Sequence, residues 1–404
     1  MTFFSTEEKF TTSSPETIDG SFDLSIRWHD DLSLNNLEVL FDALPGKPVL
    51  SPFQEPCFLH AFSQTVAKAR CDRFSIASFH LAGDDRPLLL VPLVWYRKGP
   101  FRLVSLPDTG LSDQNGPVLS SEFENLPDAL KANVLPMLVG SLPRCDLLKI
   151  ANIAPTIGSI ANPFYDAEQA VASNVALCLD RGMLDEVGSE PKKSVYKEAD
   201  AKFRKLLRAG VEFVEAETAA QSEQICRVLL EQRRQRQNWT GDEVHDEFYR
   251  YLSGMTGSEG LVKAFALKNG EEVVAAAIVL ANRACANGVL VSIGDPKWHR
   301  LSPGMVLFVK SIEWARQRDV ARFSLGAGMY AYKNRFKAAP VVTKSVMVPK
   351  SKAGDLLVAA ISARQSARQL RRNVANAGKS LRPSHAFNQL VALADRSTTR
   401  PARR

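Results

Sequence analysis

Apolar residues recur along the first half of the chain in short runs that have the length and composition of β-strands. The first two runs flank a Gly-Asp-Asp-Arg-Pro segment, which is typical of a tight turn between strands. A polar loop and then a helix near 125–141, which contains Pro136, precede the last run. The strands expected in this half are 74–81, 88–96, 101–106 and 145–153.

The second half repeats this order of elements with different residues. A strand, a turn, two strands, a loop, a helix and a final strand follow one another as they do in the first half. Such a repeat indicates two copies of one α/β unit. The strands expected in the second copy are 261–267, 273–281, 284–293 and 320–325, and its helix is 305–318.

Helical segments connect and follow the two copies. Over 192–210 the apolar residues are spaced so that they share one face, and the glycine at the end of this segment is suited to stop a helix. A second helix is expected over 218–237. After the second copy the pattern predicts a strand over 341–348 and a last helix over 352–377.

This order of elements predicts an α/β (α+β) protein of two tandem domains, each a mixed, largely antiparallel sheet flanked by helices. The segment 1–20 is rich in Ser, Thr and Glu and is expected to be disordered. The domains are expected at 21–185 and 186–350, with a C-terminal helix over 351–378 and a basic flexible tail over 379–404.

The composition is that of a soluble globular protein, with 404 residues, 45% hydrophobic and 24% charged. No apolar run approaches the roughly 20 residues that cross a bilayer. The N-terminus lacks the pattern of a signal peptide, so a cytoplasmic location is expected. Six well-separated cysteines predict reduced thiols, and the histidines lack metal-ligand spacing, so no metal site is expected.

The net charge of +7 is concentrated at the C-terminus. From Lys350 onward there are twelve Lys and Arg residues and two Asp residues, whereas the rest of the chain has 39 basic and 42 acidic residues. The tail is therefore the part suited to an anionic surface. The broadly acidic body does not favour specific binding of nucleic acid.

The segment Ser-Pro-Gly at 302–304 predicts a helix start with free backbone N–H groups. Serine is a good N-cap residue, proline fits the first helical turn, and glycine lets a ligand approach the backbone. Free N–H groups and the helix dipole together favour an anion. The alternative is an ordinary start of a buried helix. The residues expected to bind an anion here are Arg300, Ser302, Gly304, Met305 and Val306.

A glycine-rich turn with aromatic and basic residues follows the next strand. In SLGAGMYAYKNRFK at 324–337, Gly326 and Gly328 keep the backbone open, and Tyr332 and Lys333 come soon after them. In a β–loop–α–β unit a ligand lies beyond the carboxyl ends of the strands, at the helix N-terminus. The turn and the helix start are therefore expected to converge on one ligand.

These two segments together resemble the GNAT acyltransferases, in particular the CelD/BcsL-like branch that is associated with bacterial polysaccharide biosynthesis. The resemblance rests on Ser-Pro-Gly at the helix start and on LGAGMYAYKNRF at 325–336. The segments 52–62 and 192–209 are also similar to that branch, and the similarity covers about residues 25–350. Ser324 departs from the branch, which often has Asp at that position, and the general GNAT phosphate loop is only approximated.

The resemblance implies two tandem GNAT-like domains, acetyl-CoA or another acyl-CoA as the donor, and a relation to FemABX-type transferases. The pantetheine arm of the donor would hydrogen-bond the backbone of Val291, Ser292 and Ile293, between the strands 285–293 and 322–326. The first copy has Asp-Gln-Asn-Gly-Pro where the second has the Ser-Pro-Gly segment. Only the second copy is therefore expected to bind the cofactor.

The resemblance also implies catalytic roles near the thioester. Tyr332 is the expected proton donor to the departing thiolate, since a free thiol has a pKa of about 8.5. Tyr330 is the reserve for this role. Asp295 is the candidate general base, although the Asp-Pro pair to which it belongs is equally typical of an ordinary turn.

Other residues are expected to meet the phosphate groups or the acceptor. Lys333 is expected to bind a phosphate or an anionic acceptor, with an ordinary surface lysine as the alternative. Gly326 and Gly328 would leave room for substrate, and Arg234 would line an acceptor groove unless its helix face is simply solvated.

The leading hypothesis is an acyltransferase that acts on a sugar-containing or amino-bearing precursor of a bacterial surface polysaccharide. One alternative is aminoacyl transfer from charged tRNA, as in the FemABX relatives. Another is a non-catalytic GNAT-like accessory protein of a polysaccharide synthase. The basic tail would then dock on the synthesis machinery or on an anionic surface.

Overall fold

The structure is a computed structural model that describes residues 24–187, 194–235, 241–255, 260–328, 330, 332–364 and 367. The predictions of a disordered segment over 1–20 and of a basic tail over 379–404 lie outside the described residues. Within the predicted last helix, residues 352–364 are helical. None of the described helices has both the length and the apolar character of a membrane-spanning segment.

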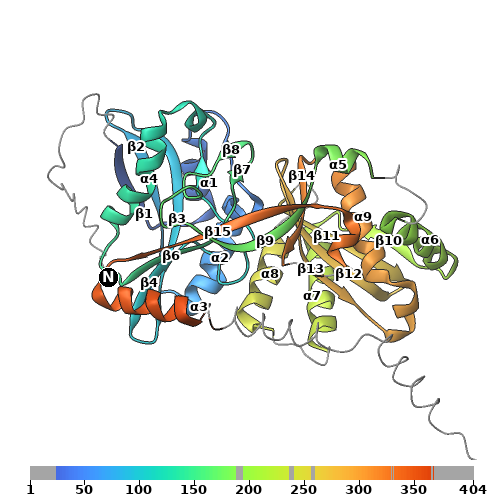
Figure 1. The fold of residues 1–404 in the computed structure, drawn as a ribbon. Helices are drawn as coiled ribbons and strands as arrows, with labels where there is room; N and C mark the ends of the chain where they lie inside the picture. The colour runs from blue at the N-terminus through green and yellow to red at the C-terminus, as the bar shows by residue number, and fades with distance from the viewer. Residues whose placement is uncertain are drawn as a thin grey trace, which may run out of the picture.

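Thirteen strands form one continuous mixed sheet through the middle of the molecule (Figure 1). The first half of the chain builds one end of it in the order β1-β2-β3-β4-β6, with β5 beside β3. Neighbours are antiparallel except β4 and β6, which are parallel. These strands are β1 (Leu24–His29), β2 (Arg73–Leu81), β3 (Pro87–Lys98), β4 (Phe101–Ser105), β5 (Val118–Leu119) and β6 (Leu147–Ile153). A separate hairpin comprises β7 (Thr156–Ile157) and β8 (Ile160–Ala161).

The second half of the chain builds the other end of the sheet with the same arrangement. The order is β14-β13-β12-β11-β10, and again one pair, β13 and β14, is parallel while the others are antiparallel. The predicted fold class, with two copies of one α/β unit, is therefore confirmed. The strands are β10 (Glu212–Glu215), β11 (Val262–Asn269), β12 (Glu272–Ala281), β13 (Ala286–Ile293) and β14 (Arg322–Ala327).

Two strands cross between the units and join their sheets. β9 (Val171–Asp180) comes from the first half but pairs with β14, and β15 (Ala339–Pro349) comes from the end of the second half but pairs with β6. β9 and β15 also pair with each other. The sequence predicted β15 but not β9, and it predicted a sheet for each domain rather than one. The domain boundary near residue 185 stays a prediction, since strands pair across it.

Helices cover both faces of the sheet (Figure 1). Pro136 is accommodated inside α4, and the predicted helix over 125–141 begins later than expected, at Asp128. In the first half the helical segments are α1 (Leu34–Asp42), η1 (Pro52–Gln54), α2 (Pro56–Phe62), a π-helical turn η2 (Ser63–Ala67), α3 (Lys68–Arg70), η3 (Ser121–Asn125), α4 (Asp128–Ser141) and α5 (Arg181–Asp185).

Two helices of the second half, α6 and α7, begin at residues whose side chains cap them. Ser194 accepts from the Lys197 N–H at the start of α6, and Thr218 forms a capping box with Gln221 at the start of α7. The segments are α6 (Val195–Arg208), α7 (Ala219–Arg234), α8 (Glu243–Met255), η4 (Pro296–Leu301), α9 (Pro303–Gln317) and η5 (Lys333–Phe336).

One hydrophobic cluster is shared by the two units. Phe58 and Phe62 of α2 pack with Leu229 of α7 and Phe248 of α8, and the ring centroids of Phe58 and Phe248 are 5.1 Å apart. Leu111, in the loop after β4, belongs to the same cluster. Burial of this apolar surface holds α7, α8 and the first unit together on one face of the sheet. α6 and α9 cover the other face of the second unit.

Candidate functional site

The predicted helix start is present as the N-terminus of α9, and Ser302 is its N-cap residue. Its φ of 47° lies in the left-handed region, which costs a non-glycine residue about 1–2 kcal/mol. Such strain is often found at functional sites. Contrary to the prediction, the Ser302 hydroxyl does not cap the helix. It accepts a hydrogen bond from Lys202 Nζ at 2.8 Å instead.

Fewer backbone donors are free at this helix start than the sequence predicted. The N–H groups of Met305 and Val306 donate to the Ser302 carbonyl oxygen at 3.0 and 3.1 Å. For the Gly304 N–H there is no acceptor among the described residues. A Cβ at Gly304 would lie 3.0 Å from Ile293, so glycine also keeps the strand end and the helix start close together. Gly304 is thus the backbone donor that remains for an anion.

A pocket of about 290 Å³ opens at this helix start. Its walls come from the end of β13, from η4 and α9, and from α6 and η5, so the helix start is not closed by side chains. Arg300 is exposed in η4 and does not line the pocket, whereas Lys202 and Arg335 do. The lining residues are Glu198, Lys202, Ile293, His299, Ser302, Met305 and Arg335.

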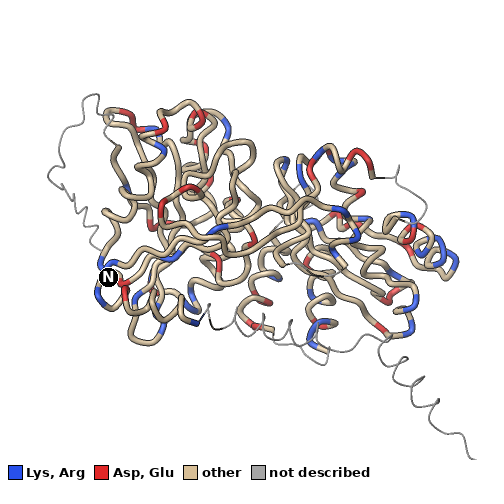
Figure 2. The backbone as a smooth tube through the Cα atoms, viewed as in Figure 1, with Lys and Arg blue, Asp and Glu red and all other residues tan. Residues whose placement is uncertain are grey.

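Glu198 joins the two cations of the pocket. Its carboxylate is 2.7 Å from Lys202 Nζ and also pairs with Arg335. The hydrogen bonds from Lys202 and Arg335 lower the pKa of Glu198 below its usual range. Figure 2 shows Lys and Arg along α6, with Asp and Glu among them. A phosphate group carries more charge and more acceptor oxygens than a carboxylate, so it can compete for the same cations.

The parallel strands β13 and β14 separate close to this helix start. They pair only at Ala286 with Phe323 and at Asn287 with Ser324. β13 then continues beside β12 alone, while β14 follows β9. We call the region between 288–293 and 325–327 the splay. It has the strand arrangement that the sequence predicted for the thioester arm.

The backbone groups of β13 face alternate sides at the splay. Gly294 N–H donates to Val274 of β12, and backbone groups two residues apart point the same way. The backbone of Ser292 therefore faces β12 and is not available to a ligand, contrary to the prediction. Its hydroxyl donates to Gln232 Oε1 at 2.6 Å. Val291 and Ile293 present their backbone groups to the splay.

The glycine turn is held by a residue from each unit. Gly326 and Gly328 have φ values of 81° and 89°, which favour glycine. Lys333 is buried, and its Nζ donates to the carbonyl oxygens of Gly326 and Ala327 at 2.8 and 2.9 Å. Burial lowers its pKa. The Ala327 N–H donates to Asp113 Oδ2 of the first unit at 3.1 Å. Lys333 is thus engaged with the turn, and it is not a surface lysine.

Tyr330 and Tyr332 lie next to this turn as a stacked pair. Their ring centroids are 6.2 Å apart, and the side chains are 60% and 45% exposed. Burial raises the pKa of Tyr332, and the neighbouring Tyr330 raises it further. A raised pKa keeps the Tyr332 hydroxyl protonated, as a proton donor to a thiolate must be.

Two other predicted residues are bound elsewhere. The Asp295 carboxylate accepts from the Lys297 N–H at 2.8 Å and caps η4, so its geometry is that of the ordinary turn. Arg234 donates through two nitrogens to Asp246 Oδ2, at 3.1 and 2.9 Å. Sequence reasoning missed Lys202 and Asp113. The basic face of α6 was a signal for the first, but nothing local marked the second.

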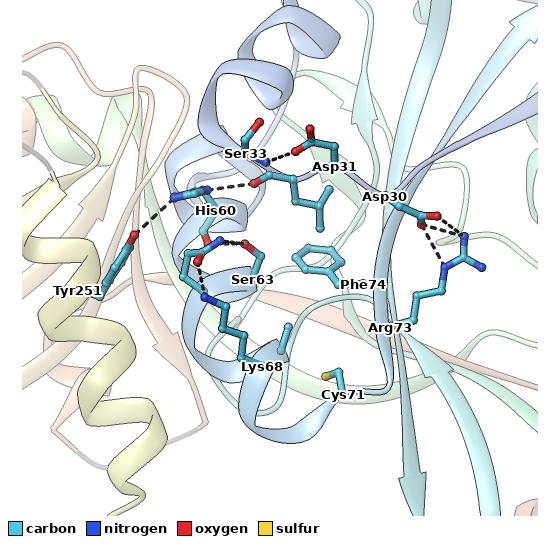
Figure 3. Close-up of a pocket in the computed structure, with 13 residues that line it drawn as sticks. Asp30, Asp31, Ser33, His60, Ser63, Lys68, Cys71, Arg73, Phe74 and Tyr251 are labelled. Carbon is cyan, nitrogen blue, oxygen red and sulfur yellow. Dashed lines mark hydrogen bonds and ion pairs between the residues drawn. The ribbon is translucent and has the colours of Figure 1, made fainter. Parts of the chain in front are cut away.

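A larger pocket of about 480 Å³ lies between α2, the first strands and α8 (Figure 3). Its charged groups already have partners within the pocket wall: Asp30 pairs with Arg73, and Asp31 accepts from the Ser33 N–H at 2.9 Å. His60 Nδ1 is 2.9 Å from the Leu32 carbonyl oxygen. The smaller pocket at α9, which adjoins the splay, is therefore the stronger candidate site.

A comparison with protein families matches residues 193–334 to the model of an acetyltransferase (GNAT) domain. This segment includes α6, the start of α9, the splay and part of the glycine turn. It carries all of the predicted site residues and the pocket lining except Arg335. No curated protein matches the chain.

Solved structures of similar fold include FemX, with a TM-score of 0.51 and 8% identity over 78% of this chain and 96% of that one. L-PGS from Bacillus licheniformis has a TM-score of 0.48 and 13% identity, over 80% of this chain and 93% of that one. A tandem GNAT protein from the clavulanic acid biosynthesis pathway has a TM-score of 0.42 and 13% identity, over 82% and 100%. The likeness to FemX supports the fold alone, and the CelD/BcsL-like branch stays a prediction.

Proposed function

We propose that this protein is an acyl-CoA-dependent N- or O-acyltransferase, with acetyl transfer as the leading case. The observation that carries the proposal is the cationic pocket at the start of α9, directly beside a parallel strand pair that separates. The match of residues 193–334 to a GNAT acetyltransferase domain supports it. The CelD/BcsL-like resemblance suggests an acceptor among the sugar-containing or amino-bearing precursors of bacterial polysaccharide or the cell envelope.

The residues of the pocket suit the diphosphate of an acyl-CoA. Lys202 and Arg335 supply positive charge, and the Gly304 N–H supplies a backbone donor at the positive end of a helix dipole. From there the splay leads towards the glycine turn, past the backbone edge of Val291 and Ile293. An acyl-CoA supplies the activated acyl group, and these residues bind and orient it.

The chemistry requires one new bond and two proton movements. The nitrogen or oxygen of the acceptor attacks the thioester carbonyl carbon, a C–N or C–O bond forms, and the C–S bond breaks. Tyr332 gives its hydroxyl proton to the departing sulfur. The proton lost by the acceptor passes to water, because Asp295 is held in the η4 turn. Proton donation of this kind contributes about 10²–10⁴-fold to the rate.

Aminoacyl transfer from charged tRNA is the second candidate. The basic face of α6 beside the pocket favours it, because phosphate backbones bind Lys and Arg. Acyl-CoA and charged tRNA would bind different sets of cations on this surface. Acyl-CoA needs Lys202 inside the pocket, whereas tRNA also needs cations outside it, such as Arg204 and Arg208, which are exposed.

Calorimetric titration with acetyl-CoA, longer acyl-CoAs, free CoA and charged tRNA tests the proposal. We expect acetyl-CoA to bind, and the double variant Lys202→Gln, Arg335→Gln to bind it at least tenfold more weakly. Arg204→Gln with Arg208→Gln is the matched control and should leave acetyl-CoA binding unchanged. Binding of charged tRNA but of no acyl-CoA would establish the second candidate instead. Binding without turnover on any acceptor would favour a non-catalytic accessory protein.

A further inference from the structure

The side of the splay that faces the first unit is polar. Cys178, Ser324 and Asn287 lie directly opposite one another on β9, β14 and β13, and residues in that relation point to the same face of a sheet. Gln114, from the loop after β4, approaches this row, with its Nε2 4.0 Å from Cys178 Sγ. The first unit therefore covers this face of the splay with a loop of its own.

Asp113 of that loop brings a carboxylate to the glycine turn. One oxygen accepts from the Ala327 N–H at 3.1 Å, and a Cβ placed on Gly326 would lie 3.0 Å from the same oxygen. That position is 3.6 Å from the carbonyl oxygen of Gly288 on β13. Asp113 is half-buried, and within the described part of the chain it forms no ion pair. Lys333 Nζ lies 3.7 Å from the same Cβ position, so its ammonium group is close to the Asp113 carboxylate although the two form no ion pair.

Asn287 supplies a second acceptor at the root of the splay. It is fully buried, and its Oδ1 has no hydrogen-bond partner among the described residues. Its Nδ2 contacts Cys285 Sγ at 3.4 Å. A buried acceptor that lacks a donor destabilises a protein unless a ligand or water supplies one. The Asp113 carboxylate and the Asn287 side-chain oxygen are thus two hydrogen-bond acceptors at the end of the splay where β13 and β14 still pair.

Arg233 lies further along the same face of the splay, and its positive charge is opposite to that of Asp113. Its guanidinium reaches the Val291 carbonyl oxygen at 3.5 Å, and it has no carboxylate partner among the residues that the structure describes. Tyr249 lies near both charges: burial raises its pKa, the Asp113 charge adds to that rise and the Arg233 charge opposes it. The Asp113 carboxylate, which has Lys333 nearby, and the Arg233 guanidinium, which contacts the Val291 carbonyl oxygen, therefore place opposite charges along one surface.

We propose that the acceptor is a primary amine that carries an acidic group several bonds away. Its amino group donates to Asp113 and Asn287 and attacks as the neutral amine after losing one proton to water, and its carboxylate or phosphate binds Arg233. The spacing supports two separated groups, since Gly288 lies near Asp113 and Arg233 contacts Val291, and these two positions are about 10 Å apart along the strand. This inference rests on the proposed function and names its substrate class. It also gives the first unit a part in binding the acceptor.

A matched set of acceptors tests the inference with acetyl-CoA as the donor and thiol release as the readout. Glucosamine 6-phosphate has both groups, glucosamine lacks the acid, and glucose 6-phosphate lacks the amine. Lysine and cadaverine form a second pair, with and without the acid. We expect both compounds with an amine and an acid to have at least tenfold higher kcat/KM than their partners.

Two variants assign the contacts. Arg233→Gln should raise KM for glucosamine 6-phosphate at least tenfold and leave KM for glucosamine unchanged. Asp113→Asn should lower kcat/KM at least tenfold for every amine, and Asp113→Glu should restore part of it. Unchanged acetyl-CoA affinity and an unchanged unfolding temperature in each variant show that the fold and the donor site are intact.

The outcomes separate this inference from the function on which it rests. If the protein binds no acyl-CoA, the proposed function fails. If it binds acetyl-CoA but transfers faster to glucose 6-phosphate than to glucosamine 6-phosphate, or to none of the amines, the amine subsite is wrong. The same holds if Asp113→Asn transfers as well as the parent protein.

Discussion

Each unit contains one parallel strand pair that separates, β4 with β6 in the first unit and β13 with β14 in the second. The gap between the strands is filled in the first unit and open in the second. In the first unit β4 and β6 pair over two residues each, and the loop after β4 then bonds to the continuing edge of β6. Asn115 N–H donates to the Asn152 carbonyl oxygen at 2.8 Å, and Asn115 Nδ2 donates to Ala151 at 2.8 Å. In the second unit, no described segment is inserted in this way between β13 and β14.

Under the proposed function, this difference gives the physical reason for expecting the thioester in the second unit and not in the first. The backbone edge that an extended arm would use in the first unit is taken by the protein's own loop. Asp113 lies two residues before Asn115 in that loop and reaches the splay of the second unit. One loop therefore closes the splay of its own unit and helps to complete that of its neighbour.

The largest effect should come from Tyr332 in the open splay. Tyr332→Phe removes the proton donor to the departing sulfur, so we expect kcat to fall by about 10²-fold or more while acetyl-CoA affinity stays nearly intact. Steady-state kinetics and calorimetry measure the two quantities. Tyr330→Phe is the control and should have the smaller effect. The reverse order would move the role to Tyr330.

The next effect concerns the pocket at the helix start of the second unit. Reversing the charge of Lys202 in Lys202→Glu should weaken acetyl-CoA binding by about 10–100-fold, or about 1.4 kcal/mol for each tenfold. Lys131→Glu on α4, the corresponding helix of the first unit, is the matched control. Equal losses in both variants would contradict a single donor site.

A smaller effect tests the closed splay of the first unit. Asn115 is buried, so Asn115→Ala should leave the Ala151 carbonyl oxygen without its donor and lower the free energy of unfolding by about 1–3 kcal/mol. Chemical denaturation measures this loss. Calorimetry of the same variant should still give one acetyl-CoA per chain. A second bound equivalent would show that the first unit has retained a cofactor site.

The smallest effect is a shift in the pH dependence of transfer. Because burial and Tyr330 both raise the pKa of Tyr332, the protonated donor persists above the usual tyrosine range, and kcat should fall only when the pH rises through this raised pKa. Tyr330→Phe removes the smaller cause, so the alkaline limb should move to slightly lower pH. A limb that stays in place or moves upward would contradict the assignment.

The fold was largely predictable, because repeated strand and helix patterns are local. β2, β3, β4, β6 and the strands from β11 to β14 have apolar runs that indicate them directly, whereas the two-residue strand β5 was not predicted. β9 was missed because its first four residues are exposed or half-buried and include the polar Ser173 and Asn174. It becomes a strand by pairing with β14 and β15. The site was predicted in part, since Ser302, Gly304 and the glycine turn carry local conformational signals.

The sequence by itself determined the repeated unit, the start of α9 and the turn at 326–328, because periodicity, capping and glycine conformation act over a few neighbouring residues. Only the tertiary structure decided which splay is closed, that Lys333 is buried against carbonyl oxygens, and that Lys202 and Asp113 face the site. These features depend on contacts between segments that are far apart in the chain. The crossing strands β9 and β15 and the shared hydrophobic cluster bring those segments together.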